Sequence, residues 1–143
     1  DDAGGVKLID LALAARPPGL LSRLLPGSVK VQGSPSYMPP EQIRGKRVDQ
    51  RADAYAFGCM LHELLTGSPP FTASTQQELL TRHLHAQPPI ASATNEAVSP
   101  KLDALLRELL AKRPDDRPDS LGDVALALRR TAFFKPGGVP PAR

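Results

Sequence analysis

The sequence has almost no cysteine and few aromatic residues. Cys59 is the only cysteine among 143 residues, so no disulfide can form within the chain and no zinc site can be built on several cysteines. We take this single thiol to indicate a reducing, cytoplasmic setting. Aromatic residues make up 4% of the chain and tryptophan is absent, so a core must be built mainly from Leu, Val and Ala.

Long apolar runs and blocks of like charge are also absent. No run of about 18 or more apolar residues occurs, so we expect no membrane span in this chain, while a longer parent protein with an anchor elsewhere stays open. The first five residues lack the basic and apolar regions of a signal peptide. The net charge is +3, but basic and acidic residues are interleaved and lack an aromatic platform, so we expect no nucleic-acid partner.

The pattern that is present predicts an irregular first third. Residues 6–10 carry β-branched side chains and partly alternate, which is typical of a short strand. Residues 12–40 contain repeated Pro and Gly, which exclude a long helix or a central strand. A loop of this length inside a compact domain is usually functional or disordered.

The first clear helix is expected from about Asp53 to just before Gly67. Asp53 can accept hydrogen bonds from the first turn, and Gly67 suits the left-handed position after the last turn. Residues 54–61 are apolar all round, which indicates a helix buried on every side in the middle of the domain.

Two further helices have start signals. Ser74 and Gln77 have the spacing of a capping box, and the helix that follows them ends near His85. The next helix starts with Ser99 as its cap and Pro100 in its first turn. Its leucines form an apolar stripe at helical spacing: Leu102, Leu105, Leu106, Leu109 and Leu110.

The end of the chain predicts one more helix and a tail. The helix spans roughly residues 120–130, and residues 133–143 have the Pro/Gly composition of a linker. The histidines do not form a predicted metal site, because His83 and His85 are two positions apart on a helix and point to different faces.

Four stretches in order resemble the protein kinase family, specifically the bacterial serine/threonine kinases of eukaryotic type. Residues 6–12 read VKLIDLA, similar to the strand that ends in the family's Asp-Phe-Gly. Residues 33–42 read GSPSYMPPEQ, close to Gly-Thr-x-x-Tyr-Met-Ala-Pro-Glu-Gln. Residues 48–71 contain Asp-x-Tyr-x-x-Gly and Glu-Leu-Leu-Thr-Gly-x-x-Pro-Phe, and residues 111–118 read AKRPDDRP, the late Arg-Pro signature.

This resemblance implies a mainly α fold, part of the large lobe of a protein kinase. It implies a short β-strand, an activation segment at about residues 10–41, and about four helices packed round a central buried helix. Residues 1–132 would be the kinase-domain portion and residues 133–143 a tail.

The resemblance also implies roles near the start of the activation segment. Asp10 matches the carboxylate that holds Mg²⁺ at the phosphates of ATP, although a strand-end carboxylate that caps a turn is the simpler alternative. Ala12 stands where the family has Gly, which restricts the backbone there. Ser22 and Ser28, the only hydroxyl residues of the loop, are phosphorylation candidates or ordinary loop serines.

Four residues further along match the family's substrate and scaffold positions. Ser34 takes the place of the family's Thr beside the substrate and keeps its hydroxyl. Glu41 and Arg117 match the partners of a buried ion pair. Asp53 matches the helix-start Asp that binds the backbone of the catalytic loop.

The implied function is a serine/threonine protein kinase that uses ATP and Mg²⁺ and acts on protein substrates, with a kinase dimer partner also open. A kinase also needs a Gly-rich phosphate loop, a strand Lys and a His-Arg-Asp catalytic loop, and none of these occurs in the chain. We therefore expect them upstream and expect the 143 residues alone to be inactive. A pseudokinase or a non-catalytic interaction module, using the surface of residues 74–90, is the alternative.

Overall fold

The computed structural model describes residues 34–130 and residue 134, and this part of the chain is mostly helical. The α-helices are α1 (Pro40–Ile43), α2 (Arg51–Thr66), α3 (Gln76–His85), α4 (Pro100–Leu109) and α5 (Leu121–Arg130). Three short 3-10 turns are η3 (Pro35–Tyr37), η4 (Ala91–Ala93) and η5 (Pro114–Asp116). The predicted mainly α class is confirmed. The strand predicted at residues 6–10 and most of the predicted tail lie outside the described residues.

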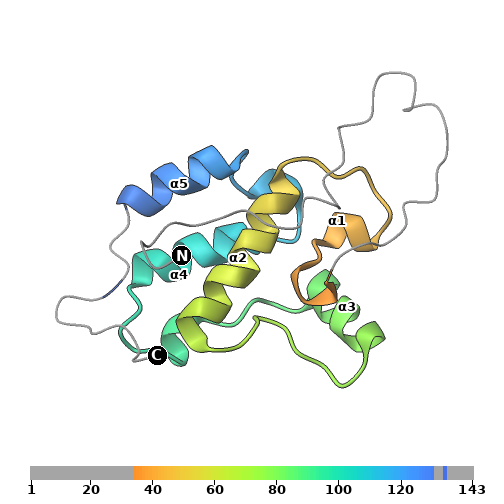
Figure 1. The fold of residues 1–143 in the computed structure, drawn as a ribbon, viewed down its shortest axis with the longest axis horizontal. Coiled ribbons are helices and arrows are strands. Elements are labelled where there is room, and N and C mark those ends of the chain that lie inside the picture. The colour runs from red at the N-terminus through yellow and green to blue at the C-terminus, as the bar shows by residue number, and fades with distance from the viewer. Residues whose placement is uncertain (1–33, 131–133, 135–143) are drawn as a thin grey trace, which may run out of the picture.

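Helix α2 runs through the middle of the described part, with α4 and α5 on one side and α1 and α3 on the other (Figure 1). It begins at Arg51, two residues earlier than predicted, because the Asp49 carboxylate accepts a hydrogen bond from the Arg51 N–H at 2.9 Å and forms the turn before the helix. It ends at Gly67, whose φ of 81° and N–H bond to the Glu63 carbonyl at 2.7 Å confirm the predicted left-handed cap.

The prediction that Asp53 caps α2 is wrong. Gln50 occupies the cap position without a side-chain hydrogen bond, and Asp53 lies inside the first turn, where its own N–H donates to the Gln50 carbonyl at 3.2 Å. A carboxylate in the first turn still interacts favourably with the positive end of the helix dipole.

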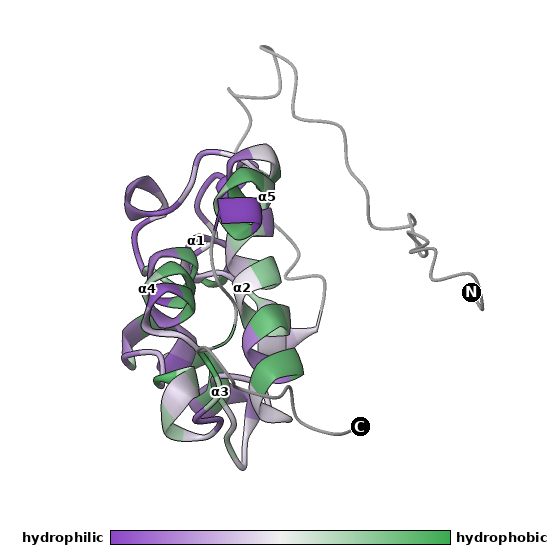
Figure 2. Ribbon diagram, turned by 90° about the vertical axis from the view of Figure 1, so that its left-hand side faces the viewer, coloured by the Kyte–Doolittle hydropathy of each residue, from purple (hydrophilic) through white to green (hydrophobic). Residues whose placement is uncertain are grey.

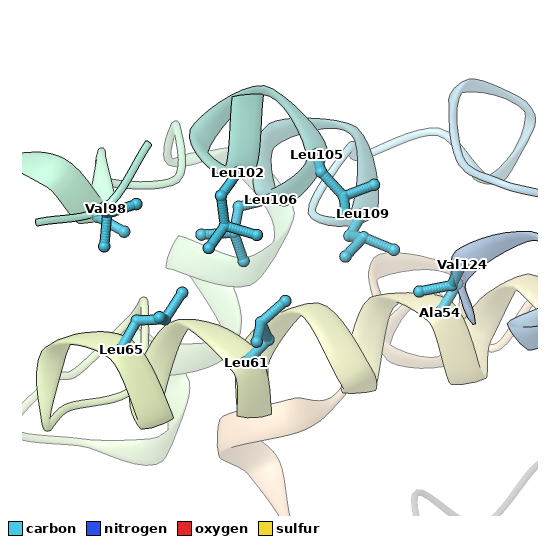
Figure 3. Packing of buried hydrophobic residues seen from close by; sticks show 10 residues of the cluster. Ala54, Leu61, Leu65, Val98, Leu102, Leu105, Leu106, Leu109 and Val124 are labelled. Atoms are coloured by element: carbon cyan, nitrogen blue, oxygen red, sulfur yellow. The ribbon is translucent and has the colours of Figure 1, made fainter. Parts of the chain in front are cut away.

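The main core lies between α2 and α4. Figure 3 shows leucines of α4 pointing toward Leu61 and Leu65 of α2, with Val124 of α5 beside Ala54. All five leucines predicted to form a stripe are buried: Leu102, Leu105, Leu106, Leu109 and Leu110. The two helices meet closely at Gly58, where an added Cβ would lie 2.8 Å from the Cβ of Leu109. The sequence of α2 therefore sets how near α4 can approach.

The prediction that α2 is buried on every side is also wrong. Met60 is 42% exposed and Leu64 is 70% exposed, four positions apart on one face. In Figure 2, where green marks hydrophobic residues, much of α2 is green. The described elements cover the remaining faces of α2, and none of them covers the face with Met60 and Leu64.

The starts of the other helices show which local signals decide. At α3 the predicted Ser74 cap is wrong by one position, because Thr75 is the cap and its hydroxyl accepts a hydrogen bond from the Glu78 N–H at 3.2 Å. At α4 the Ser99 cap is confirmed by its bond from the Leu102 N–H at 3.2 Å. Helix α1 was not predicted, since we read Pro40 as a helix breaker, whereas it occupies the first turn, where a missing N–H costs nothing.

Candidate functional site

The segment before α1 places Ser34 at the surface. The Ser34 carbonyl accepts a hydrogen bond from the Tyr37 N–H at 3.2 Å, which closes η3. The Ser34 side chain makes no capping hydrogen bond, and the residue is exposed. Ser34 is therefore accessible at the surface, whereas residues 38–40 are buried.

Tyr37 fixes this surface segment to α2. Its hydroxyl donates to Oε2 of Glu63 at 2.5 Å, and this bond to a carboxylate raises the pKa of Tyr37. Its ring packs on the buried cluster of Tyr55, Cys59 and Leu110. The sequence does not predict this contact, because no local pattern links two residues 26 positions apart.

Glu41 and Arg117 form a buried, two-pronged ion pair. Both residues are 4% exposed, and the two terminal nitrogens of Arg117 donate to the two Glu41 oxygens at 2.8 and 2.9 Å. Arg117 also donates to the carbonyls of Ala111 at 2.8 Å, Arg51 at 3.1 Å and Lys112 at 3.4 Å. The guanidinium therefore ties α1, the start of α2 and the chain after α4 together.

The Arg117 guanidinium also lies 4.8 Å from the centroid of the Tyr55 ring. A cation over an aromatic face is attracted to it, and a charge taken out of water needs such partners. Burial of Tyr55 in turn raises the pKa of its hydroxyl. Its neutral ring is thus a wall of the ion-pair site.

Asp53 is not brought to this site. It is exposed, and no hydrogen bond to its carboxylate occurs among the residues that the structure describes. The role implied by the family resemblance, binding the backbone of a catalytic loop, involves residues that this sequence does not contain.

A second buried network joins α3 to the core and was also missed. The Tyr55 hydroxyl and Nδ1 of His83 share a hydrogen bond of 2.9 Å, and the Phe71 ring packs edge-on against His83 with centroids 4.9 Å apart. Burial, with the nearby Lys112 ammonium, lowers the pKa of His83 to about 4. His83 is thus a neutral core histidine, whereas His85 is exposed, as their spacing predicted.

Three of the predicted site residues, Asp10, Ser22 and Ser28, lie outside the described residues. Within residues 34–130 and 134, no group of three His, Cys, Asp or Glu side chains could hold a metal ion. No helix in this part of the chain has the length and apolar character needed to cross a membrane.

The described residues therefore hold a segment whose first residue is at the surface. Ser34 is exposed and residues 38–40 are buried; the Tyr37–Glu63 bond attaches the segment to α2, and the Glu41–Arg117 pair follows it. Such an arrangement can position a docked chain beside reacting groups that other residues supply.

Comparison with known proteins gives one family and several relatives. The family described as "Protein kinase domain" matches residues 1–129. Serine/threonine-protein kinase PknB of Mycobacterium tuberculosis is 38% identical over 110 residues, which cover 77% of this chain and 18% of PknB. PknB of Mycolicibacterium smegmatis is 35% identical over 125 residues, 87% of this chain and 20% of that protein.

A third relative comes from a third genus. The DNA damage-responsive serine/threonine-protein kinase RqkA of Deinococcus radiodurans is 39% identical over 120 residues, 84% of this chain and 18% of RqkA. The chain thus spans no more than 20% of the length of these relatives.

Proposed function

This chain belongs to the protein kinase family, and we propose that it supplies the large-lobe portion of a serine/threonine protein kinase that acts in signalling. Such a kinase transfers the γ-phosphate of ATP to Ser or Thr side chains of protein substrates. The observation that carries the proposal is the buried Glu41–Arg117 pair, which holds the surface segment of Ser34 on the core. The alternative is a pseudokinase or a non-catalytic interaction module.

In this proposal the exposed Ser34 lies beside the substrate hydroxyl, and Asp10 holds Mg²⁺. The family uses ATP and Mg²⁺, and the metal neutralises charge on the phosphate oxygens when it is bound. Ser22 and Ser28 are the proposed phosphorylation sites of the activation segment. A phosphate there adds negative charge that can pair with Arg and order a loop.

The 143 residues contain no Gly-rich loop, strand Lys or His-Arg-Asp sequence, so we propose that they transfer no phosphate by themselves. Residues 1–132 are then the domain portion and residues 133–143 a tail. Protein substrates follow from the family. A kinase dimer partner, the absence of a nucleic-acid partner and a cytoplasmic location stay predictions.

The test compares the full-length protein that carries these residues with the 143 residues alone. We expect the full-length protein to transfer labelled phosphate from ATP to Ser and Thr peptides, the Asp10→Ala variant to lose this transfer, and the 143 residues to show none. Ser34→Thr keeps a hydroxyl at this position, so this variant should keep the transfer. A full-length protein that binds peptides but transfers nothing would support the non-catalytic alternative.

A further inference from the structure

The loop after α1 carries three cations at the surface. Residues 44–47 read Arg-Gly-Lys-Arg and connect α1 to the turn that starts α2, at the outer edge of the described part (Figure 1). Arg44, Lys46 and Arg47 are all exposed. No other four consecutive residues of the described part contain three lysines or arginines.

The backbone of this loop is fixed against the end of α1. The Gly45 N–H donates to the Gln42 carbonyl at 3.0 Å, and the Lys46 N–H donates to the Glu41 carbonyl at 2.8 Å. Gly45 has a φ of 62°, in the left-handed region, which turns the chain away from the helix. The cationic side chains therefore start from a defined turn, so little backbone ordering is needed when they bind a partner.

No carboxylate of the described residues neutralises these cations. The ion pairs in this part of the chain join Arg51, Arg82 and Arg117 to acidic side chains, and none of them involves the loop. Glu41, the acidic residue that precedes the loop, is already bonded to Arg117. The loop thus presents three clustered positive charges, which together attract an anionic partner more than a single surface cation does.

The loop lies within reach of a peptide bound beside Ser34. Ser34 and Arg44 are ten positions apart in the sequence. The stretch between them includes η3 and α1, which shorten it, so the two residues lie at most about 30 Å apart. An extended peptide covers that distance with about nine residues.

We propose that residues 44–47 bind an acidic segment of the protein substrate, within about nine residues of the Ser or Thr that accepts phosphate. The inference rests on the proposed kinase function, which brings that Ser or Thr to the segment of Ser34. Arg donates two hydrogen bonds to one carboxylate, and Lys adds a compact positive charge. The loop has no aromatic side chain on which bases could stack, so an acidic peptide fits it better than a nucleic acid.

The test uses the full-length protein that carries these residues and pairs of Ser peptides. One peptide of each pair has a block of Glu on the amino-terminal or the carboxyl-terminal side of the Ser, and its partner has Gln there. Phosphate transfer gives kcat/KM, and fluorescence anisotropy measures binding without any need for transfer. For one of the two sides we expect kcat/KM to be about tenfold higher with Glu than with Gln, mainly through a lower KM. The preference should fade at about 0.5 M salt, where exposed charges are screened.

Two charge-matched variants show whether the loop is the source of this preference. The test variant replaces all three cations of the loop with Gln and should lose the preference for the Glu peptide. The control variant should keep the preference, because it replaces with Gln three exposed cations of α4 and α5: Lys101, Arg107 and Arg129.

The outcomes separate this inference from the proposed function. Equal transfer to and equal binding of the Glu and Gln peptides would overturn the acidic preference and leave the kinase function in place. Binding of the Glu peptide that depends on the loop, without transfer to any peptide, would support the acidic-peptide surface and contradict the kinase function. A preference that survives in the test variant, or tighter binding of single-stranded DNA than of a Glu peptide with equal charge, would overturn the proposal.

Discussion

At the scale of single residues, the Glu41–Arg117 ion pair is almost fully removed from water. Arg117 and Glu41 are bonded at 2.8 and 2.9 Å with almost no exposure, so removing either partner leaves a buried charge alone. We expect Glu41→Ala and Arg117→Ala each to lower the free energy of unfolding by about 3–5 kcal/mol, or to unfold the chain. Urea denaturation followed by circular dichroism measures this.

A surface ion pair of the same chain is the control. Arg51 bonds Asp115 and Asp119, but both carboxylates are 72% exposed, so Arg51→Ala should cost less than about 1 kcal/mol. The double variant of Glu41 and Arg117 should lose less than the sum of the single losses, since no lone charge remains. Additive losses would contradict this account of the pair.

The contacts of this site differ in how well the sequence predicts them. Glu41 and Arg117 are 76 positions apart, and only the family resemblance suggested that they meet. Glu63 and His83 received no such hint, because a Tyr–Glu or Tyr–His bond between distant helices leaves no periodic pattern. The Asp53 cap failed for a local reason, since a neighbouring Asp competes for the same helix start.

At the scale of elements, α2 and α4 touch where α2 has no side chain. A Cβ at Gly58 would lie 2.8 Å from the Cβ of Leu109, so Gly58→Ala must push the helices apart. We expect a loss of about 1–3 kcal/mol in the free energy of unfolding. Gly122→Ala on α5 is the matched control: its nearest contact is the Ser120 hydroxyl at 3.3 Å, and alanine favours the helix. A Gly58 variant as stable as the original chain would be evidence against the close approach.

The attachment of α3 should depend on pH through His83. Its pKa falls from 6.5 to about 4 in the folded chain, so between these values the unfolded chain holds the extra proton. The free energy of unfolding should therefore fall as the pH falls from about 6.5 to 4, by at most about 1.4 kcal/mol per pH unit from this group. Urea denaturation at several pH values measures the slope.

Carboxylates add their own pH dependence, so the comparison is between variants. His83→Gln removes this titration and should show a shallower slope than the original chain, whereas His85→Gln, on the exposed side of the same helix, tests the effect of replacing a histidine. If the His83 variant kept the full slope, the neutral buried histidine would not be its source.

Elements were easier to predict than their surroundings. Three local signals were confirmed: the α4 stripe of leucines, the Ser99 cap and the Gly67 cap. Each depends on the geometry of one helix and its ends, and not on distant residues. The Ser74 cap was wrong because Thr75 beside it fits the same pattern one residue later. How much of α2 is buried depends on its neighbours, and its composition alone could not predict the exposed face.

At the scale of the whole molecule, that exposed face of α2 places two large apolar side chains at the surface of the described part. Leu64 is 70% exposed and Met60 is 42% exposed, side by side on one helix. Exposed apolar groups that lie together favour association. We expect Leu64→Lys to reduce the concentration-dependent self-association of the chain, measured by sedimentation velocity, because it places a charge in this face.

The same substitution should leave the fold intact, which separates association from stability. An exposed helix position tolerates Lys within about 0.5 kcal/mol, whereas Leu65→Ala, one residue on and buried in the core, should cost about 2–5 kcal/mol. If the Leu64 variant associates as strongly as the original chain while remaining folded, another surface drives the association. If it instead loses stability as Leu65→Ala does, then the face of α2 with Leu64 is covered in solution.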